Sequence, residues 1–309
     1  MADTVFDSVA IIGVGLIGSS IARAARATGA AGAVTLYDAE ETVRREAGTL
    51  DLGTVAASLE DAVRDADCVI LCTPVGALEA VAAETVPAMK DGAILTDVGS
   101  VKGQAAAALA SAGGAHVHVI PGHPIAGTEQ SGPAAGFAGL FEDAWHILTP
   151  LAEGGPGYGE AVETLTAFWA ALGAKVETMD VAKHDRVLAI TSHLPHLIAF
   201  NIVATAYDME SVEEGDVVKY SAGGFRDFTR IAASDPVMWR DVFLGNKDAV
   251  LDALGRFSED LAALQRAIRW GDGDALMKEF ERARGIRTAI LEAGMDSSEV
   301  NFGRNKPEE

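Results

Sequence analysis

Short apolar runs alternate with longer stretches of helical periodicity through the first 180 residues of the chain. The apolar runs predict β-strands at residues 9–12, in a run ending at 36–38, and at residues 67–73, 93–97, 116–120, 143–150 and 174–179. The helical stretches are residues 19–27, 76–85, 103–111 and 159–172. This alternation predicts an α/β fold in which all these strands belong to one doubly wound parallel sheet of the Rossmann type.

The pattern changes near Asp180. Residues 181–206, 235–270 and 274–291 are long stretches of helical periodicity, with no convincing strand among them. We therefore expect two domains: residues 1–180, which contain the sheet, and an all-helical domain at residues 181–309.

The turn after the first predicted strand has the spacing G-x-G-x-x-G. Gly13 suits a tight turn, Gly15 lets a pyrophosphate approach the backbone, and Gly18 allows the helix to pack closely on the strand. Leu16 and Ile17 lie at the start of that helix, where free N–H groups and the helix dipole favour an anion. Together with the strand–helix–strand context, the motif predicts a dinucleotide cofactor.

Other cofactor candidates follow later strands. Asp38 ends the second strand, about 20 residues beyond the last glycine, where its carboxylate would accept hydrogen bonds from ribose hydroxyls and repel a 2′-phosphate. It therefore predicts NAD in preference to NADP. Thr73, Pro74 and Asp97 come at the ends of the next two strands, at the edge where such sheets bind ligands.

The same edge contains candidates for chemistry. Ser100 follows the strand at residues 93–97, and His123 follows the strand at residues 116–120 in a loop between prolines. Thr128 and Glu129 come a few residues later. The position of His123 at a strand end beside a cofactor site favours a functional role over a structural one.

Two polar clusters stand out in the helical half. His193 and His196 are three residues apart and would share one helix face. No further metal ligands accompany them at zinc-like spacing and Pro195 disturbs the turn, so we expect no metal and two imidazoles facing a polar cleft. Arg226 and Arg230 follow a glycine pair at i,i+4 spacing, and two such guanidinium groups on one face suit a carboxylate ligand.

The composition excludes several classes of protein. The chain has 309 residues, 24 of them Lys or Arg and 45 Asp or Glu, for a net charge of −21, so a nucleic-acid partner is not expected. The longest apolar runs, such as residues 68–72, are far shorter than a membrane span of ~20 residues. The N-terminus lacks the pattern of a signal peptide, which predicts a cytoplasmic protein. Cys68 and Cys72 are expected to be reduced packing residues.

Taken together, the motifs resemble those of the prephenate/arogenate dehydrogenase family of tyrosine biosynthesis. The matching segments occur in the family's order and are residues 13–18, 97–102, 122–129, 192–196, 223–230 and 234–240. The resemblance implies NAD-dependent oxidative decarboxylation of prephenate to 4-hydroxyphenylpyruvate, or of its amino analogue arogenate to tyrosine. It also implies a homodimer formed through the helical domain.

The resemblance implies roles for individual residues. His123 matches the catalytic base, and Ser100 matches the serine that hydrogen-bonds the substrate's hydroxyl group. Arg230 matches the arginine that holds a substrate carboxylate, and His196 matches the histidine near the substrate's side chain. We expect His193, Arg226, Thr128 and Glu129 to complete the substrate site, with Glu129 bearing on the choice between prephenate and arogenate.

Two alternatives compete with this interpretation. A hydroxyacid dehydrogenase of the same two-domain plan would need a catalytic lysine after a glycine turn, and Lys183 lacks that turn. A catalytically silent dinucleotide sensor would need neither His123 nor Arg230. Because cofactor and substrate are anions, an acidic protein must bind them through local positive potential, for which Lys102 and Arg240 are additional candidates.

Overall fold

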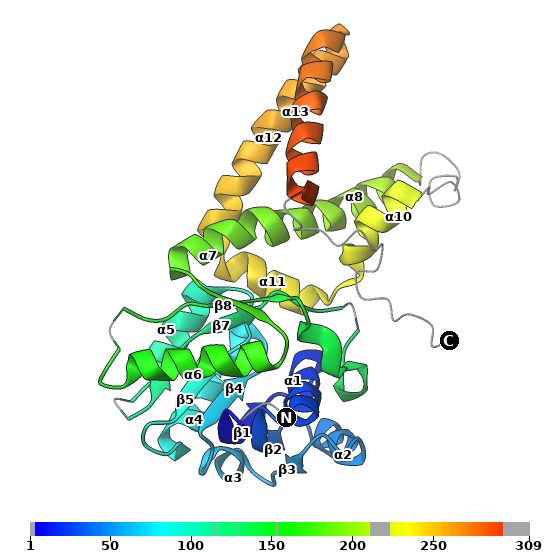
Figure 1. Cartoon of the computed structure of the whole chain (residues 1–309). Coiled ribbons are helices and arrows are strands. Elements are labelled where there is room, and N and C mark those ends of the chain that lie inside the picture. The colour runs from blue at the N-terminus through cyan, green and yellow to red at the C-terminus, as the bar shows by residue number, and fades with distance from the viewer. Residues whose placement is uncertain (1–3, 115, 129, 153, 211–222, 293–309) are drawn as a thin grey trace. The chain divides into compact units, whose positions relative to one another are not determined.

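A computed structural model describes residues 4–114, 116–128, 130–152, 154–210 and 223–292 of the chain (Figure 1). The chain divides into two compact units, Met1–Val250 and Leu251–Glu309. The first unit contains all the described strands and the polar clusters singled out above. The second unit contains most of the helix at Lys247–Trp270, which begins four residues before the boundary, and the whole of the helix at Gly273–Glu292.

The first unit is built on a six-stranded parallel sheet in the order β3-β2-β1-β4-β5-β6. Its strands are β1 (Phe6–Ile12), β2 (Ala31–Tyr37), β3 (Thr54–Val55), β4 (Cys68–Leu71), β5 (Ile94–Asp97) and β6 (His118–Val119). The helices between them are α1 (Leu16–Thr28), α2 (Glu41–Thr49), α3 (Leu59–Val63), α4 (Leu78–Thr85) and α5 (Lys102–Ala112). Short 3₁₀ turns add η1 (Val75–Ala77), η2 (Val86–Ala88), η3 (Pro133–Ala135) and η4 (Ala138–Phe141). The prediction of a doubly wound parallel sheet is confirmed, although α2, β3 and α3 were not predicted.

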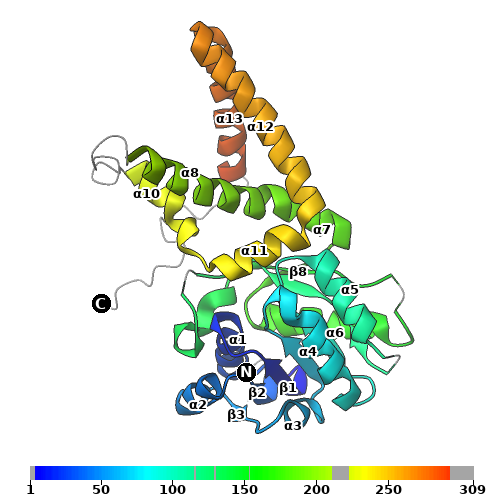
Figure 2. The same cartoon turned by 180° about the vertical axis from the view of Figure 1, so that it is seen from behind.

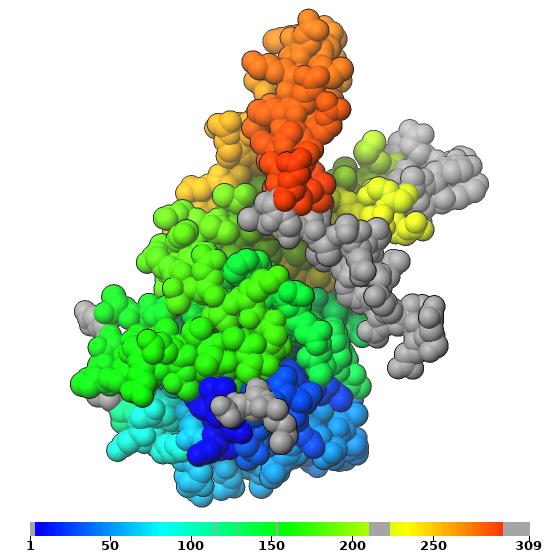
Figure 3. Space-filling model, viewed as in Figure 1, coloured from blue at the N-terminus to red at the C-terminus, as the bar shows by residue number. Residues whose placement is uncertain are grey.

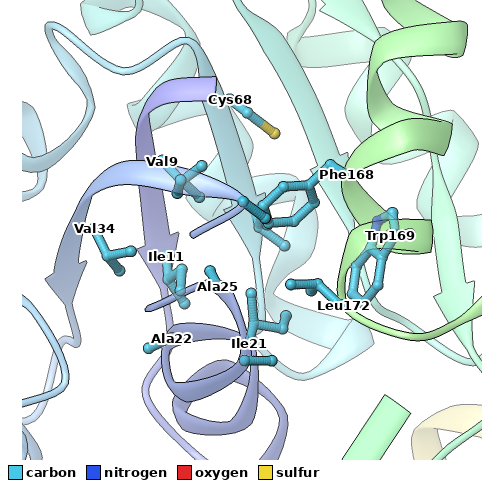
Figure 4. Packing of buried hydrophobic residues seen from close by; sticks show 14 of the residues in the cluster. Val9, Ile11, Ile21, Ala22, Ala25, Val34, Cys68, Phe168, Trp169 and Leu172 are labelled. Atoms are coloured by element: carbon cyan, nitrogen blue, oxygen red, sulfur yellow. The ribbon is translucent and has the colours of Figure 1, made fainter. Parts of the chain in front are cut away.

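Helices bury both faces of the sheet. Alternate residues of β1 enter two separate apolar clusters, with Val9 and Ile11 in one and Ala10 and Ile12 in the other. The first cluster packs against α1 and α6 (Tyr158–Ala171), as the close-up in Figure 4 shows around Phe168. The space-filling view shows α6 covering this face (Figure 3), and the view from behind shows α4 and α5 on the other (Figure 2).

The last predicted strands do not extend this sheet, contrary to our expectation. They are β8 (Trp145–Leu148) and β9 (Lys175–Thr178), and with β7 (Gly122–Pro124) they form a second sheet in the order β7-β8-β9. β7 is antiparallel to β8, whereas β8 and β9 are parallel. Pro121 has no N–H group to continue the ladder beyond β6, and the chain passes there from the first sheet into the second. His123 therefore lies in a strand rather than in the predicted loop.

The helical stretches are shorter than their periodicity predicts. The region begins with α7 (Val181–Leu188), a π-helical turn η5 (Ala189–His193) and α8 (Leu194–Glu210), and continues with α10 (Gly223–Thr229), the 3₁₀ turn η6 (Arg230–Ala233) and α11 (Pro236–Gly245). It ends with α12 (Lys247–Trp270) and α13 (Gly273–Glu292). Pro195 cannot donate to the helix that precedes it, which accounts for the π turn between α7 and α8.

One described helical stretch, Val181–Met209, is long and apolar enough to cross a membrane by length and composition alone. It also contains the buried polar side chains of His184, Asp185 and His193. Core helices share this composition, so the absence of a membrane partner stays a prediction.

A buried ion pair joins the elements at the carboxyl edge of the sheet. The side chains of Asp97, at the end of β5, and Lys102, at the start of α5, are both fully buried, with Oδ2 and Nζ 2.5 Å apart. The Lys102 ammonium also donates to the Gly122 carbonyl, and Asp97 accepts from the N–H groups of Gly99 and Gly122. The carboxylate of Asp185, on α7, accepts from the N–H groups of Lys102 and Gly103, each at 2.8 Å. We call these groups the Asp97–Lys102–Asp185 network. It uses the Lys102 charge internally, so the expectation that Lys102 is available to an anionic ligand is wrong.

Replacing Lys102 with Met should lower the free energy of unfolding by ~3–5 kcal/mol, because Asp97 would keep a buried charge without its partner. The double variant Lys102→Met/Asp97→Leu should recover much of that loss, since both charges are then gone. Urea denaturation followed by circular dichroism measures both. A loss below ~1 kcal/mol in the single variant would contradict the assignment of a buried ion pair.

Candidate active site

The three glycines of the first turn have different surroundings. Gly13 has a φ of +97°, and a Cβ there would lie 2.6 Å from the Cys72 carbonyl oxygen. A Cβ on Gly18 would lie 2.1 Å from the Gly13 carbonyl oxygen, whereas a Cβ on Gly15 would have no neighbour within 4 Å. Gly13 and Gly18 therefore allow the close approach of α1 to the sheet. Gly15 instead leaves open the space beside the start of α1.

The start of α1 suits a pyrophosphate. Gly15 is the N-cap and provides no side-chain cap, while Leu16 and Ile17 form the first turn and are half-buried. The first N–H groups of a helix have no partner within the helix and favour an anion. This end of α1 fits the anionic part of a dinucleotide.

Asp38 lies directly beside this turn. Its Oδ2 accepts a hydrogen bond from the Val14 N–H at 2.8 Å, and its Oδ1 accepts one from the Glu40 N–H at 3.0 Å. The Arg44 guanidinium lies 5.4 Å from the centre of the Tyr37 ring and donates to the Asp38 and Ala39 carbonyl groups. The structure thus fixes the carboxylate expected to bind ribose at the glycine turn.

The other cofactor candidates lie in two settings. Thr73 follows β4, and its backbone nitrogen would lie 3.2 Å from a Cβ on Gly13. Its hydroxyl oxygen is buried and has no hydrogen-bond partner among the described residues, and Pro74 follows directly before η1. Asp97 is different, because its carboxylate is fully buried in the Asp97–Lys102–Asp185 network. A cofactor contact of Asp97 stays a prediction.

His123 is held at the edge where β7 meets α7. Its Nδ1 lies 2.9 Å from Nε2 of His184, and Nδ1 of His184 lies 2.8 Å from Oδ1 of Asp185. Burial lowers the pKa of His123 well below its usual value of 6.5, and the nearby His184 and Lys102 act in the same direction. The imidazole is therefore neutral at pH 7, as a general base requires.

Sequence reasoning missed His184 and Asp185. The only signal in the sequence is an adjacent His–Asp pair early in a predicted helix, 61 residues from His123. Nothing in the local pattern connects the two segments.

His193 and His196 both lie against Trp239. The His196 ring stacks on Trp239 with centroids 3.7 Å apart, and its Nδ1 lies 2.9 Å from the Ser192 carbonyl oxygen. Nδ1 of His193 lies 3.1 Å from the amide nitrogen of Asn246. The residues described here contain no group of three His, Cys, Asp or Glu side chains that could hold a metal ion.

His193 lies next to Ser100. Burial lowers the pKa of His193 to about 4, although Asp185 and the Ser100 backbone oppose this shift. Ser100 itself is half-buried after β5. The structure therefore brings a predicted substrate residue of the helical region to the strand-end serine.

The two arginines are placed differently. Both are exposed, Arg226 on α10, which ends at Thr229, and Arg230 at the start of the 3₁₀ turn, so the one-face spacing expected of a continuous α-helix is interrupted. Burial is the main cause that lowers the pKa of His196, and the charge of Arg230 adds to it, which places Arg230 near that ring. Arg240 donates to Asp241 and is largely exposed.

The remaining candidates lie after β7. Thr128 is half-buried, and its hydroxyl accepts a hydrogen bond from the Gln130 N–H at 3.2 Å. Glu129 falls outside the described residues.

A doubly wound sheet with an open glycine turn, and a buried neutral imidazole at its carboxyl edge, define a dinucleotide-dependent oxidoreductase. Comparison with family models identifies the family of oxidoreductases to which the chain belongs. The model of the prephenate dehydrogenase nucleotide-binding domain matches residues 21–178, and that of the prephenate dehydrogenase dimerization domain matches residues 180–282. The chain belongs to the prephenate dehydrogenase family.

Individual relatives agree with this assignment. The chain is 44% identical over 288 residues to the cyclohexadienyl dehydrogenase of Zymomonas mobilis, covering 93% of this chain and 97% of that protein. Prephenate dehydrogenase from Aquifex aeolicus, solved in complex with hydroxyphenyl propionate and NAD⁺, is 34% identical with a TM-score of 0.84, covering 94% of this chain and 99% of that one. Synechocystis arogenate dehydrogenase is 26% identical with a TM-score of 0.76, and the match covers 92% of this chain and 99% of that one.

The same substitution at two glycines should separate binding from folding. Gly15→Ala should weaken NAD binding about tenfold, because the methyl group enters the space left for the pyrophosphate, with a stability cost of at most ~1 kcal/mol. Gly18→Ala should instead lower the free energy of unfolding by ~1–3 kcal/mol through overpacking. Calorimetric titration with NAD and thermal unfolding measure the two effects. Unchanged NAD affinity in folded Gly15→Ala would contradict the placement of the pyrophosphate.

Proposed function

We propose that this protein oxidatively decarboxylates prephenate to 4-hydroxyphenylpyruvate, with NAD as the electron acceptor. The observation that carries the proposal is His123, a buried neutral imidazole with one ring nitrogen occupied by His184 and the other left for a substrate. Membership of the prephenate dehydrogenase family supplies the substrate class. A catalytically silent sensor would need no such base.

NAD, when bound, supplies the acceptor for the hydride that leaves the hydroxyl-bearing ring carbon. The residues proposed to hold it are the glycine turn, the first turn of α1 and Asp38, with Thr73 and Pro74 beside them. The carboxylate of Asp38 would meet a 2′-phosphate with like charge, which favours NAD over NADP.

His123 handles the proton in this proposal. As hydride leaves the ring carbon, Nε2 of His123 takes the hydroxyl proton. The electrons of the carbon–carboxylate bond then enter the ring, carbon dioxide departs, and His123 returns the proton to the phenolate oxygen. The sum is prephenate dianion plus NAD⁺ giving 4-hydroxyphenylpyruvate anion, carbon dioxide and NADH, with no net release of a proton. Ser100 is proposed to hold the same hydroxyl group.

The substrate's negative charges need nearby cations in a protein of net charge −21. We assign a carboxylate to Arg230, beside His196, because a guanidinium group pairs with a carboxylate through two parallel hydrogen bonds. Arg226 and His193 are proposed to line the same site.

Arogenate is the second candidate substrate. The names of the Zymomonas mobilis cyclohexadienyl dehydrogenase and the Synechocystis arogenate dehydrogenase favour it. Arogenate has an ammonium group where prephenate has a keto group, and Thr128 and Glu129 are the residues proposed to meet it. A hydroxyacid dehydrogenase fits less well, because Lys183 is exposed and follows no glycine turn.

We further propose a homodimer formed through residues 181–309, with residues 1–180 as the NAD-binding domain. The match of residues 180–282 to a dimerization domain supports this. Large apolar side chains are exposed on α12 and α13, among them Ile268, Trp270, Met277 and Phe280. A cytoplasmic location and the absence of nucleic-acid and membrane partners stay predictions.

The proposal is tested by mixing the purified protein with NAD and prephenate, and separately with NAD and arogenate, while following the absorbance of reduced cofactor. We expect turnover with prephenate, and faster turnover with NAD than with NADP. Turnover with arogenate alone would establish the second candidate. Absence of turnover with both substrates would overturn the proposed function.

The acidic limb of kcat/KM should have an apparent pKa below 6.5. A base works only when unprotonated, and burial lowers the pKa of His123, so the proton binds only at lower pH. Initial rates at low prephenate concentration across pH 5 to 8 measure the limb. Circular dichroism at each pH is the control, because histidines buried in the neutral form destabilise the fold as pH falls. A limb at or above 6.5 in folded protein would contradict the assignment of His123 as the base.

A further inference from the structure

Three buried side chains form a chain of contacts that ends at the catalytic imidazole. The side chains are His123 on β7, and His184 and Asp185 on α7, with relative exposures of 8%, 0% and 9%. The ring centroids of the two histidines are 5.2 Å apart and inclined at 62°, so the contact at 2.9 Å joins edges rather than stacked faces. The contact at 2.8 Å between His184 and Asp185 continues the chain.

The donor and the acceptor in each hydrogen bond can be assigned by starting from the Asp185 carboxylate. Burial alone would raise the pKa of Asp185, but hydrogen bonds from His184 and from the N–H groups of Lys102 and Gly103 lower it overall. An ionised carboxylate can only accept, so Nδ1 of His184 must carry the hydrogen. A His184 ring whose single hydrogen is on Nδ1 has Nε2 free to accept. Nδ1 of His123 must therefore donate to it, which leaves Nε2 of His123 with a free lone pair.

We infer that His184 and Asp185 are positioning residues that hold His123 in the tautomer whose Nε2 can accept the substrate's proton. The assignment of tautomers rests on the hydrogen-bond geometry and on the ionised Asp185 carboxylate, while its effect on rate rests on the proposed function. The anionic end of the chain also stabilises the imidazolium that forms when His123 takes the proton. Neither His184 nor Asp185 needs to touch the substrate.

The contact with His184 aids catalysis because it excludes the tautomer of His123 that cannot accept a proton on Nε2. A neutral imidazole can carry its hydrogen on either nitrogen, and His123 with the hydrogen on Nε2 cannot accept a proton there. A partner that fixes both the tautomer and the ring orientation keeps the base competent in every encounter with substrate. Because the Asp185 carboxylate also accepts from Lys102 and Gly103, the far end of the chain is fixed to the first turn of α5.

A second buried histidine in the same region provides a matched control. His146 lies on β8 and is fully buried, and its ring stacks on Trp169 with centroids 3.7 Å apart. Neither of its ring nitrogens has a hydrogen-bond partner in the part of the chain that the structure describes. Changing His146 to Phe thus removes a buried imidazole without removing a chain of hydrogen bonds.

The direct test is ¹H–¹⁵N correlation NMR of the ¹⁵N-histidine-labelled protein at pH 7. The His123 signals are assigned by their loss in His123→Gln. We expect the ring hydrogen on Nδ1 in both His123 and His184. A His123 ring with the hydrogen on Nε2 in the unsubstituted protein would overturn the inference. This readout needs no turnover, so it stands or falls separately from the proposed function.

The kinetic test compares three folded variants with checked thermal stability. His184→Phe should lower kcat by about 10- to 100-fold, a part of the effect of a general base, with KM within about twofold. His184→Gln should recover part of the loss, because its amide carbonyl can accept from Nδ1 of His123. His146→Phe should change kcat by less than about threefold, since no base is reoriented. An unchanged kcat in folded His184→Phe, or an equal loss in His146→Phe, would overturn the positioning role, and if His184→Phe does not fold, the NMR result decides.

Discussion

The buried ion pair between Asp97 and Lys102 is the interaction on which the rest of the site depends. Two opposite charges at 2.5 Å in a fully buried position are stable only if their remaining hydrogen-bonding capacity is used. The N–H and carbonyl groups of Gly122 on β7, and the N–H group of Gly99 after β5, meet that requirement, while the Lys102 N–H joins the pair to Asp185. As a result, the end of β5, the first turn of α5, the strand β7 and the helix α7 share one polar network.

That network has functional consequences on both sides. On the side of the sheet, the hydrogen bonds of Asp97 and Lys102 to Gly122 hold the start of β7, the strand that contains His123. On the side of the helical region, Asp185 accepts from the first N–H groups of α5 and contacts His184, so the contact between His184 and His123 is joined to the core. Because the Lys102 charge is paired with Asp97 inside the protein, the proposed anion-binding groups are the start of α1 and Arg230.

The sequence predicts the parts of the site that depend on local geometry. The glycine spacing and the position of Asp38 follow from what a strand–turn–helix requires, and the structure places each beside the other. The strand-end rule points to Ser100, which follows β5, and to His123, which the structure places within β7; their roles stay predictions. Nonlocal features are not predictable in this way. The second sheet depends on the pairing of β7 with β8 and of β8 with β9, and the contact of His123 with His184 joins segments 61 residues apart. The interior position of Lys102 is equally hidden, because a lysine after a strand is usually exposed.

The most direct test of the network's structural role is native-state hydrogen exchange of the backbone amides of Lys102 and Gly103. The first N–H groups of a helix ordinarily exchange quickly, because they have no partner within the helix. If Asp185 accepts from both and the buried ion pair holds the elements together, these two amides exchange only through global unfolding, as slowly as those of β4. Rapid exchange, at the rate of an open helix end, would contradict the account.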